Sequence, residues 1–145
     1  MKLVLQRVAR ASVCIDGGTV AAISRGLLIL FGAEKLDGSD KVQYLADKAL
    51  TLRIFPDTQG RMNLSCLDIS GEVLVVSQFT LAGDCTKGRR PGFDNAAQPE
   101  EAESLYRQFI EKVSASGLTV KEGRFGADMQ VELVNDGPVT FILDR

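Results

Sequence analysis

The apolar positions in the first third of the chain fall into short runs that are typical of β-strands. In several runs polar and apolar residues alternate, and Asp16-Gly17-Gly18 predicts a hairpin turn between two of them. Two other runs, Leu27–Phe31 and Val73–Val76, are continuously apolar, which is typical of strands covered on both faces. The predicted strands span residues 2–8, 11–15, 19–24, 27–31, 72–79, 118–121, 129–134 and 139–143.

Two segments carry apolar residues at helical spacing. The apolar positions of the first are Val42, Leu45, Ala46, Ala49 and Leu52. Asp37 or Ser39 can cap this helix, while Pro99 suits the first position of the second helix and Gly117 suits its end. Two helices are too few to cover both faces of a doubly wound sheet. We therefore predict one α+β domain over residues 1–145, a layered β/β/α arrangement of mostly antiparallel sheets with two main helices on one side.

The composition is that of an ordinary globular protein, with 45% hydrophobic and 25% charged residues among 145. No stretch approaches the roughly 20 apolar residues that span a bilayer, and the apolar run at the N-terminus is too short for a signal peptide. We therefore expect a cytoplasmic protein without membrane association. The net charge of −2 provides no strong field for a polyanion, so any contact with nucleic acid must be local. The three cysteines are widely spaced and the chain has no histidine, so neither a disulfide framework nor a zinc site is expected.

The segment SQFTL, Ser77 to Leu81, places two hydroxyl side chains where a buried strand reaches the surface. Such hydroxyls are weak nucleophiles until a neighbouring base accepts their proton. Because the chain has no histidine, a Ser-His-Asp arrangement is excluded, and no S-x-x-K spacing follows Ser77. Cys85 would lack a histidine partner in the same way. Taken alone, these residues favour a structural interpretation, in which Ser77 and Thr80 bond backbone groups at the strand end.

A second motif, NDGPVT, spans Asn135 to Thr140 between two predicted strands. Asn-Asp-Gly is a strong turn signal, and a hairpin turn is an adequate local interpretation. The Gly137-Pro138 bond leaves another interpretation open, because X-Pro bonds can adopt the cis form. A cis bond would point successive carbonyl groups the same way and present backbone to a ligand.

Between the two motifs, Lys87, Arg89 and Arg90 form the only dense group of positive charges. A solvated loop is the simple interpretation of this group. Its position soon after SQFTL also suits phosphate binding at the rim of the same site.

Together these features resemble the D-aminoacyl-tRNA deacylases, formerly called D-tyrosyl-tRNA(Tyr) deacylases. The resemblance covers essentially the whole chain, from LVLQRVARASV at Leu3–Val13 to the intact motifs SQFTL and NDGPVT. It implies a homodimeric esterase whose active site lies at the subunit interface, where SQFTL of one chain faces the Gly-Pro motif of the other. It also implies proofreading by hydrolysis of the ester between a D-amino acid, or glycine, and the terminal adenosine of tRNA, with no metal or cofactor.

The resemblance assigns roles to individual residues. Backbone N–H groups near Phe79 and Thr80 would stabilise the oxyanion, with assistance from the 2′-hydroxyl of the substrate. In a rival hypothesis the Thr80 hydroxyl attacks as a covalent nucleophile. Carbonyl groups of Gly137 and Pro138 would form a wall that leaves no room for the Cβ of an L-amino acid. The expected catalytic residues are Ser77, Gln78, Phe79 and Thr80, and the expected substrate-binding residues are Arg7, Met129, Asn135, Gly137 and Pro138.

Two of these residues have simpler alternatives. The resemblance places Arg7 near the Gly-Pro motif, where it would fix the carbonyls, but a surface arginine on a strand is the plain alternative. It places Met129 in a segment that lines the adenosine pocket, although an inward-facing core methionine fits equally well.

Two other functional classes fit parts of the pattern. A non-catalytic module could hold RNA 3′ ends in the same adenosine pocket with the Arg89 rim. A structural dimer without a ligand would leave Gly137-Pro138 as a turn with a trans bond. The intact pair of motifs favours the enzyme, because a pure binder needs no wall against L-amino acids.

Overall fold

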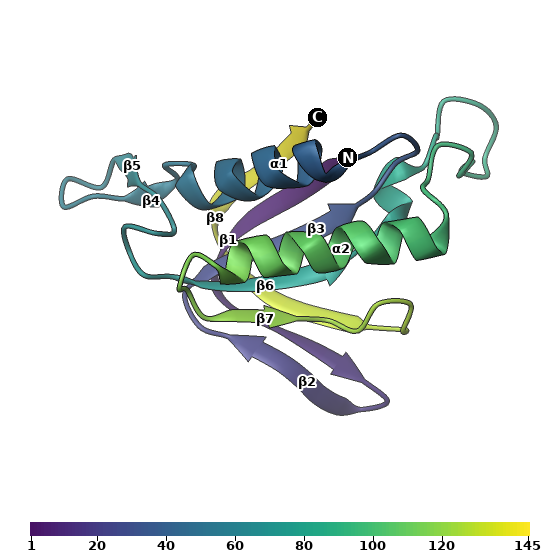
Figure 1. Cartoon of the computed structure of the whole chain (residues 1–145). Helices are drawn as coiled ribbons and strands as arrows, with labels where there is room; N and C mark the ends of the chain where they lie inside the picture. Colours follow the sequence, from purple (N-terminus) through teal and green to yellow (C-terminus); the bar gives the residue numbers. More distant parts are fainter.

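Six strands form one curved sheet, and two helices lie side by side on one of its faces (Figure 1). The computed structural model describes residues 1–145. Its strands are β1 (Lys2–Ile15), β2 (Gly18–Ile23), β3 (Gly26–Gly32), β4 (Phe55–Pro56), β5 (Met62–Leu64), β6 (Glu72–Ser77), β7 (Val120–Glu122) and β8 (Gln130–Asp144). Its helices are α1 (Ser39–Thr51), α2 (Pro99–Ser114) and the 3₁₀ helix η1 (Phe79–Ala82).

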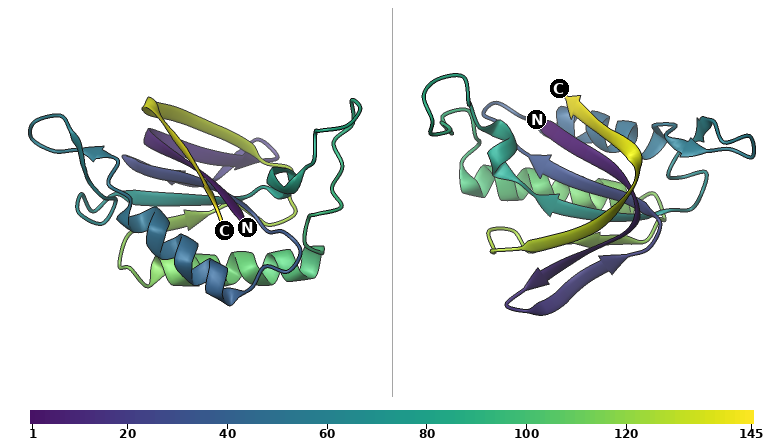
Figure 2. Two further views of the ribbon diagram at one scale, coloured as in Figure 1. Left: turned by 90° about the horizontal axis from the view of Figure 1, so that it is seen from above. Right: turned by 180° about the vertical axis from the view of Figure 1, so that it is seen from behind.

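The sheet has the strand order β2-β1-β3-β6-β7, and β8 pairs with the other edge of β1. The first half of β1 pairs with β3 and its second half with β2, while β8 follows β1 over nearly its whole length. The β3–β6 and β6–β7 pairs are parallel, and the other pairs are antiparallel. Because β1 is long and bent, the sheet curls and brings β2 towards β6 and β7 (Figure 2).

The curled sheet separates two hydrophobic cores. The larger core lies between the sheet and the helices, and Phe31, Leu45, Phe55, Val75 and Phe109 are among its buried members. Within it, the hydroxyl of Tyr106 donates to the carbonyl of Val75 over 2.9 Å, and burial raises the pKa of this phenol. The smaller core lies inside the curl and contains Val8, Val13, Leu28, Leu74 and Val76. Both faces of β3 and β6 are therefore covered, as their continuous apolar runs predict.

The predicted fold class is confirmed, since the domain is α+β with both helices on one side of the sheet. Several details of the prediction are wrong, and one is that the strand predicted at 72–79 ends at Ser77, since Phe79 begins η1. The runs at 2–8 and 11–15 belong to one strand, and so do the runs at 129–134 and 139–143. The N-cap of α1 is Gly38, without a side-chain cap, because the Asp37 carboxylate accepts instead from the N–H of Glu34, from Lys41 and from the α-ammonium of Met1.

None of the helices is long and apolar enough to cross a membrane.

Candidate active site

SQFTL marks the point where the chain leaves the central sheet. Ser77 is the last residue of β6 and pairs with Phe31, and the N–H of Gln78 donates to the Phe31 carbonyl over 2.7 Å. The chain then turns into η1, which packs tightly on the end of β3. A Cβ on Gly32 would lie 2.8 Å from the Cβ of Leu81, so this approach requires glycine.

The two hydroxyl groups of the motif have no base beside them in this chain. Gln78 Nε2 donates to Thr80 Oγ1 over 2.6 Å, and the Ser77 hydroxyl makes no hydrogen bond. The structural interpretation therefore fails here, because neither hydroxyl bonds a backbone group. An amide N–H cannot accept the proton of Thr80, so within one chain Thr80 Oγ has no partner that could activate it as a nucleophile.

A pocket of about 430 Å³ lies beside the motif. SQFTL supplies Ser77, Gln78 and Phe79, and the segment before β8 supplies Met129 together with Phe125, Gly126, Ala127 and Asp128. Phe79 and Thr80 begin η1, so their N–H groups have no acceptor within the helix. Met129 is half-buried, since it packs against the smaller core and also lines the pocket.

The NDGPVT motif forms no hairpin, and the turn prediction is wrong. β8 runs through the motif, and its pairing with β1 shifts register on both sides of Val8. The irregular segment lets β8 bend while it stays paired to the same neighbour. The Gly137-Pro138 peptide bond is cis, and both residues are exposed.

Arg7 and Asn135 hold this irregular segment in place. Arg7 Nε donates to the carbonyl of Asp136 over 2.8 Å, and Nη1 donates to the carbonyl of Ile54 over 2.6 Å. Asn135 Nδ2 donates to the carbonyls of Arg7 and Val139 over 2.9 and 3.0 Å. The plain alternative for Arg7, an exposed strand arginine, does not hold, because its side chain is only 11% exposed.

The structure thus sorts the expected residues into two groups that lie apart within one chain. Arg7 pairs with Leu27 near the start of β3, and Ser77 pairs with Phe31 near its end. Across the sheet, the Gly-Pro segment and SQFTL lie three strands apart, from β8 through β1 and β3 to β6. They are also offset by four residues along the strands, so the distance between the two segments is roughly 20 Å. A single chain does not bring both groups to one small substrate.

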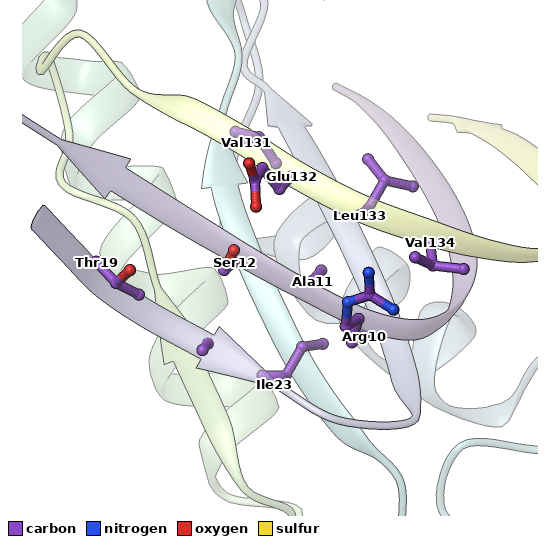
Figure 3. Close-up of a pocket in the computed structure, with 10 residues that line it drawn as sticks. Arg10, Ala11, Ser12, Thr19, Ile23, Val131, Glu132, Leu133 and Val134 are labelled. Carbon is purple, nitrogen blue, oxygen red and sulfur yellow. The ribbon is translucent and has the colours of Figure 1, made fainter. Parts of the chain in front are cut away.

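A larger hollow, of about 770 Å³, lies over β1, β2 and β8 (Figure 3). Val131, Leu133 and Val134 from β8 line it together with Ala11 from β1 and Ile23 from β2, and the polar side chains of Arg10 and Glu132 also line it. Leu133 and Val134 are exposed to solvent, as is Ile142 further along the same strand. This surface is an apolar patch on a strand that has a free edge.

No group of three or more histidine, cysteine, aspartate or glutamate side chains is arranged to hold a metal ion. The thiol of Cys66 is buried and makes no contact with the pocket, and burial raises its pKa to about 12. Cys85 is exposed on the loop after η1.

Several residues around the site have no signature in the sequence. Phe93 packs on Phe79 with ring centroids 5.1 Å apart, and Phe125 forms part of the pocket wall. Ile54 contributes only a backbone carbonyl to Arg7. No local pattern could identify these contacts, because each joins segments that are distant along the chain.

The chain matches the profile of the D-Tyr-tRNA(Tyr) deacylase family over residues 4–144. It is 59% identical to a D-aminoacyl-tRNA deacylase of Geotalea uraniireducens (strain Rf4), over 99% of this chain and 93% of that one. It is 56% identical to a D-aminoacyl-tRNA deacylase of Clostridioides difficile (strain 630), over 99% and 97% of the two chains.

Solved structures share the fold. One is described as c-Myc DNA Unwinding Element Binding Protein, with a TM-score of 0.94 and 42% identity over 100% of this chain and 99% of that one. Another, described as a probable eukaryotic D-amino acid tRNA deacylase, has a TM-score of 0.86 and 18% identity, over 99% of this chain and 98% of that one. The match over residues 4–144 and the identity to curated relatives show that this chain belongs to the D-Tyr-tRNA(Tyr) deacylase family.

Proposed function

We propose that the protein hydrolyses the ester between a D-amino acid and the terminal adenosine of tRNA, and accepts glycine as well. The observation that carries this proposal is the start of η1, where Phe79 lines the pocket and the consecutive N–H groups of Phe79 and Thr80 lack acceptors within the helix. The family match over residues 4–144 supports the substrate class. The products are the free amino acid and tRNA.

The chemistry needs little help from side chains, because an aminoacyl ester is already activated. Water attacks the carbonyl carbon, the bond to the ribose oxygen breaks, and that oxygen takes up a proton. The N–H groups of Phe79 and Thr80 stabilise the oxyanion, a contribution of roughly 3–4 kcal/mol per donor. The 2′-hydroxyl of the ribose positions the water. Gln78 supports this arrangement because its amide holds Thr80 Oγ1 at 2.6 Å and orients the first turn of η1.

The active form in this proposal is a homodimer. The roughly 20 Å between SQFTL and the Gly-Pro segment within one chain is too long for one aminoacyl group. A second copy supplies Gly137 of the partner subunit and Pro138 of the partner subunit to the pocket. The apolar patch on β8 supports this arrangement, because Leu133 and Val134 are exposed beside the Gly-Pro segment and β8 is paired on one edge only (Figure 3).

In this arrangement the enzyme distinguishes D- from L-amino acids by steric exclusion of the L-form. The exposed backbone of the Gly-Pro segment meets the Cα of the amino acid and leaves no space where an L-residue carries its Cβ. A D-residue directs its side chain outward, and glycine passes because it has no Cβ. The wall is rigid because Arg7 and Asn135 bond the carbonyls on both sides of it. The selection is therefore independent of side-chain identity.

The test is ester release from matched D- and L-tyrosyl-tRNA, followed over time at catalytic protein concentrations with a chelator present. Release from the D-form alone supports a deacylase that filters chirality without a metal ion. Equal release from both forms would contradict the backbone wall. Binding of tRNA without release from either form would indicate a module that only holds RNA 3′ ends.

A further inference from the structure

The loop between η1 and α2, residues 83–98, carries three positive charges at its tip, and its two carboxylates, Asp84 and Asp94, form no ion pair with them. Lys87, Arg89 and Arg90 are exposed at its tip, and none of them takes part in an ion pair or a side-chain hydrogen bond. The tip from residue 85 to 91 contains no carboxylate, although the chain as a whole has a net charge of −2. Three cations therefore face solvent together in a slightly acidic protein.

The base of this loop is well anchored. Asp84 and Gly92 exchange two backbone hydrogen bonds of 2.8 and 2.9 Å, and the Asp84 carboxylate accepts from the N–H of Thr86 over 2.8 Å. The N–H of Ala97 donates to the carbonyl of Ala33 at the end of β3. An isolated β-bridge between Asp84 and Gly92 thus closes the base of the tip, so ordering the tip on a ligand costs less entropy than ordering an open loop.

The loop is also connected to the proposed active site at both ends. Phe79 precedes the loop and Pro99 follows it, and both residues line the pocket. Phe93 packs on Phe79 at 5.1 Å, and a Cβ on Gly83 would lie 3.1 Å from Phe93, so the loop base rests directly on η1. Figures 1 and 2 show the loop projecting beyond the sheet beside η1. Arg90 lies three residues before Phe93, so the Cα atoms of the two residues are within about 10 Å of each other.

We propose that Lys87, Arg89 and Arg90 bind the backbone phosphates of the unpaired nucleotides that precede the terminal adenosine of tRNA. This inference rests on the proposed function. Guanidinium groups bind phosphate through two parallel N–H donors, and lysine adds a compact point charge. The contacts read no base, so they serve every tRNA alike. They exist before and during the reaction, so they lower KM and leave kcat nearly unchanged.

The test compares two substrates that share the ester and differ in phosphate. One is D-tyrosyl-tRNA, and the other is D-tyrosyl-adenosine, a nucleoside ester without any phosphate. The variant is Arg89→Ala/Arg90→Ala, and the control is Lys48→Ala/Arg61→Ala, which removes two exposed charges, one in the last turn of α1 and one in the turn between β4 and β5. Unfolding midpoints verify that all three proteins are equally folded.

We expect kcat/KM of Arg89→Ala/Arg90→Ala for the tRNA ester to fall about 10- to 100-fold at low salt, mainly through KM, with the nucleoside ester unaffected. The slope of log kcat/KM against log salt becomes shallower by about 1.4, since each phosphate contact on a single strand contributes about 0.7. The control keeps wild-type values for both substrates.

An unchanged rate on tRNA, or an equal loss on both esters, would overturn the inference and leave the proposed function standing. A loss in the control equal to that in the variant would overturn it as well, because the effect would then follow from net charge. A wild-type protein that cleaves neither ester would overturn the proposed function, and this inference with it.

Discussion

Arg7 Nε donates to the carbonyl oxygen of Asp136 over 2.8 Å and lies 3.1 Å from the carboxylate of the same residue. Its Nη1 reaches the carbonyl of Ile54 over 2.6 Å. One side chain on β1 therefore joins the residue that precedes Gly137 to the segment that precedes β4. The planar guanidinium can bond both carbonyls at once because its donors point in fixed, divergent directions.

Arg7→Lys keeps the charge and removes this geometry. A single ammonium cannot reach both carbonyls, so one buried acceptor loses its partner, and we expect the free energy of unfolding to fall by about 1–3 kcal/mol. In the proposed enzyme the wall also loosens, and hydrolysis of the L-ester rises relative to the D-ester. Urea unfolding and the D/L rate ratio measure the two effects. Arg61→Lys, at an exposed position in the turn between β4 and β5, is the matched control and should change neither.

Gly137→Ala tests whether the irregular segment of β8 tolerates a side chain. A Cβ there would collide with the side-chain oxygen of Asn135 and lie 2.5 Å from the backbone nitrogen of Val139. Asn135 would have to move, and its two hydrogen bonds would weaken. We expect hydrolysis of D-tyrosyl-tRNA to fall at least about tenfold, which corresponds to 1.4 kcal/mol. Gly18→Ala, where the nearest atom is 3.6 Å away, should retain full activity. Wild-type rate and selectivity in Gly137→Ala would contradict the backbone wall.

Thr80→Val separates the two catalytic hypotheses. Valine has the shape of threonine without the hydroxyl, so the backbone N–H groups of η1 stay in place while the Gln78 contact is lost. If the backbone stabilises the oxyanion, we expect kcat to fall less than about tenfold, the effect of one weakened hydrogen bond. A complete loss of turnover with an unchanged unfolding midpoint would indicate that Thr80 Oγ attacks. Ser77→Ala, which removes a hydroxyl that makes no hydrogen bond within the chain, provides the comparison.

Asp37 makes stability depend on pH. Burial by itself raises the pKa of its carboxyl, but hydrogen bonds from Lys41, from the α-ammonium of Met1 and from the N–H of Glu34 outweigh burial, so the pKa lies below 3.8. The folded state therefore binds this proton more weakly than the unfolded chain does. The stabilisation is complete above the unfolded pKa and is lost as the pH falls through the lower, folded pKa.

Asp37→Asn should accordingly be less stable than the wild type at pH 7, by about 1.5–3 kcal/mol. The difference should shrink as the pH falls below about 4, where the unfolded carboxyl becomes protonated. Urea unfolding between pH 2.5 and 7, values chosen to bracket that range, measures it. Glu111→Gln changes an exposed carboxylate outside any ion pair and should show no such trend. A difference that is constant over this range would mean that the charge of Asp37 does not stabilise the fold.

The sequence predicted the SQFTL part of the site and the NDGPVT part to different extents. SQFTL could be located because a continuous apolar run predicts a buried strand, and the residue after it must emerge at the sheet edge. The bend into η1 could not be predicted, because it depends on close packing against Gly32 from another strand. For NDGPVT the sequence left a hairpin turn and a cis bond facing a ligand as alternatives, because Asn-Asp-Gly has the local preferences of a turn. Pairing with β1 along both flanks kept the strand continuous.

The sequence by itself determined which segments are buried and how each is built locally. Apolar runs specified β3 and β6, helical spacing with Pro99 specified where α2 begins and which face is apolar, and intact motifs indicated the family. Only the tertiary structure decided how far β1 and β8 extend and that Phe93 rests on Phe79. Only the folded chain also shows that SQFTL and the Gly-Pro segment lie apart. The physical reason is that periodicity and propensity report on a residue and its near neighbours, whereas strand pairing and side-chain contacts join positions whose separation along the chain carries no signal.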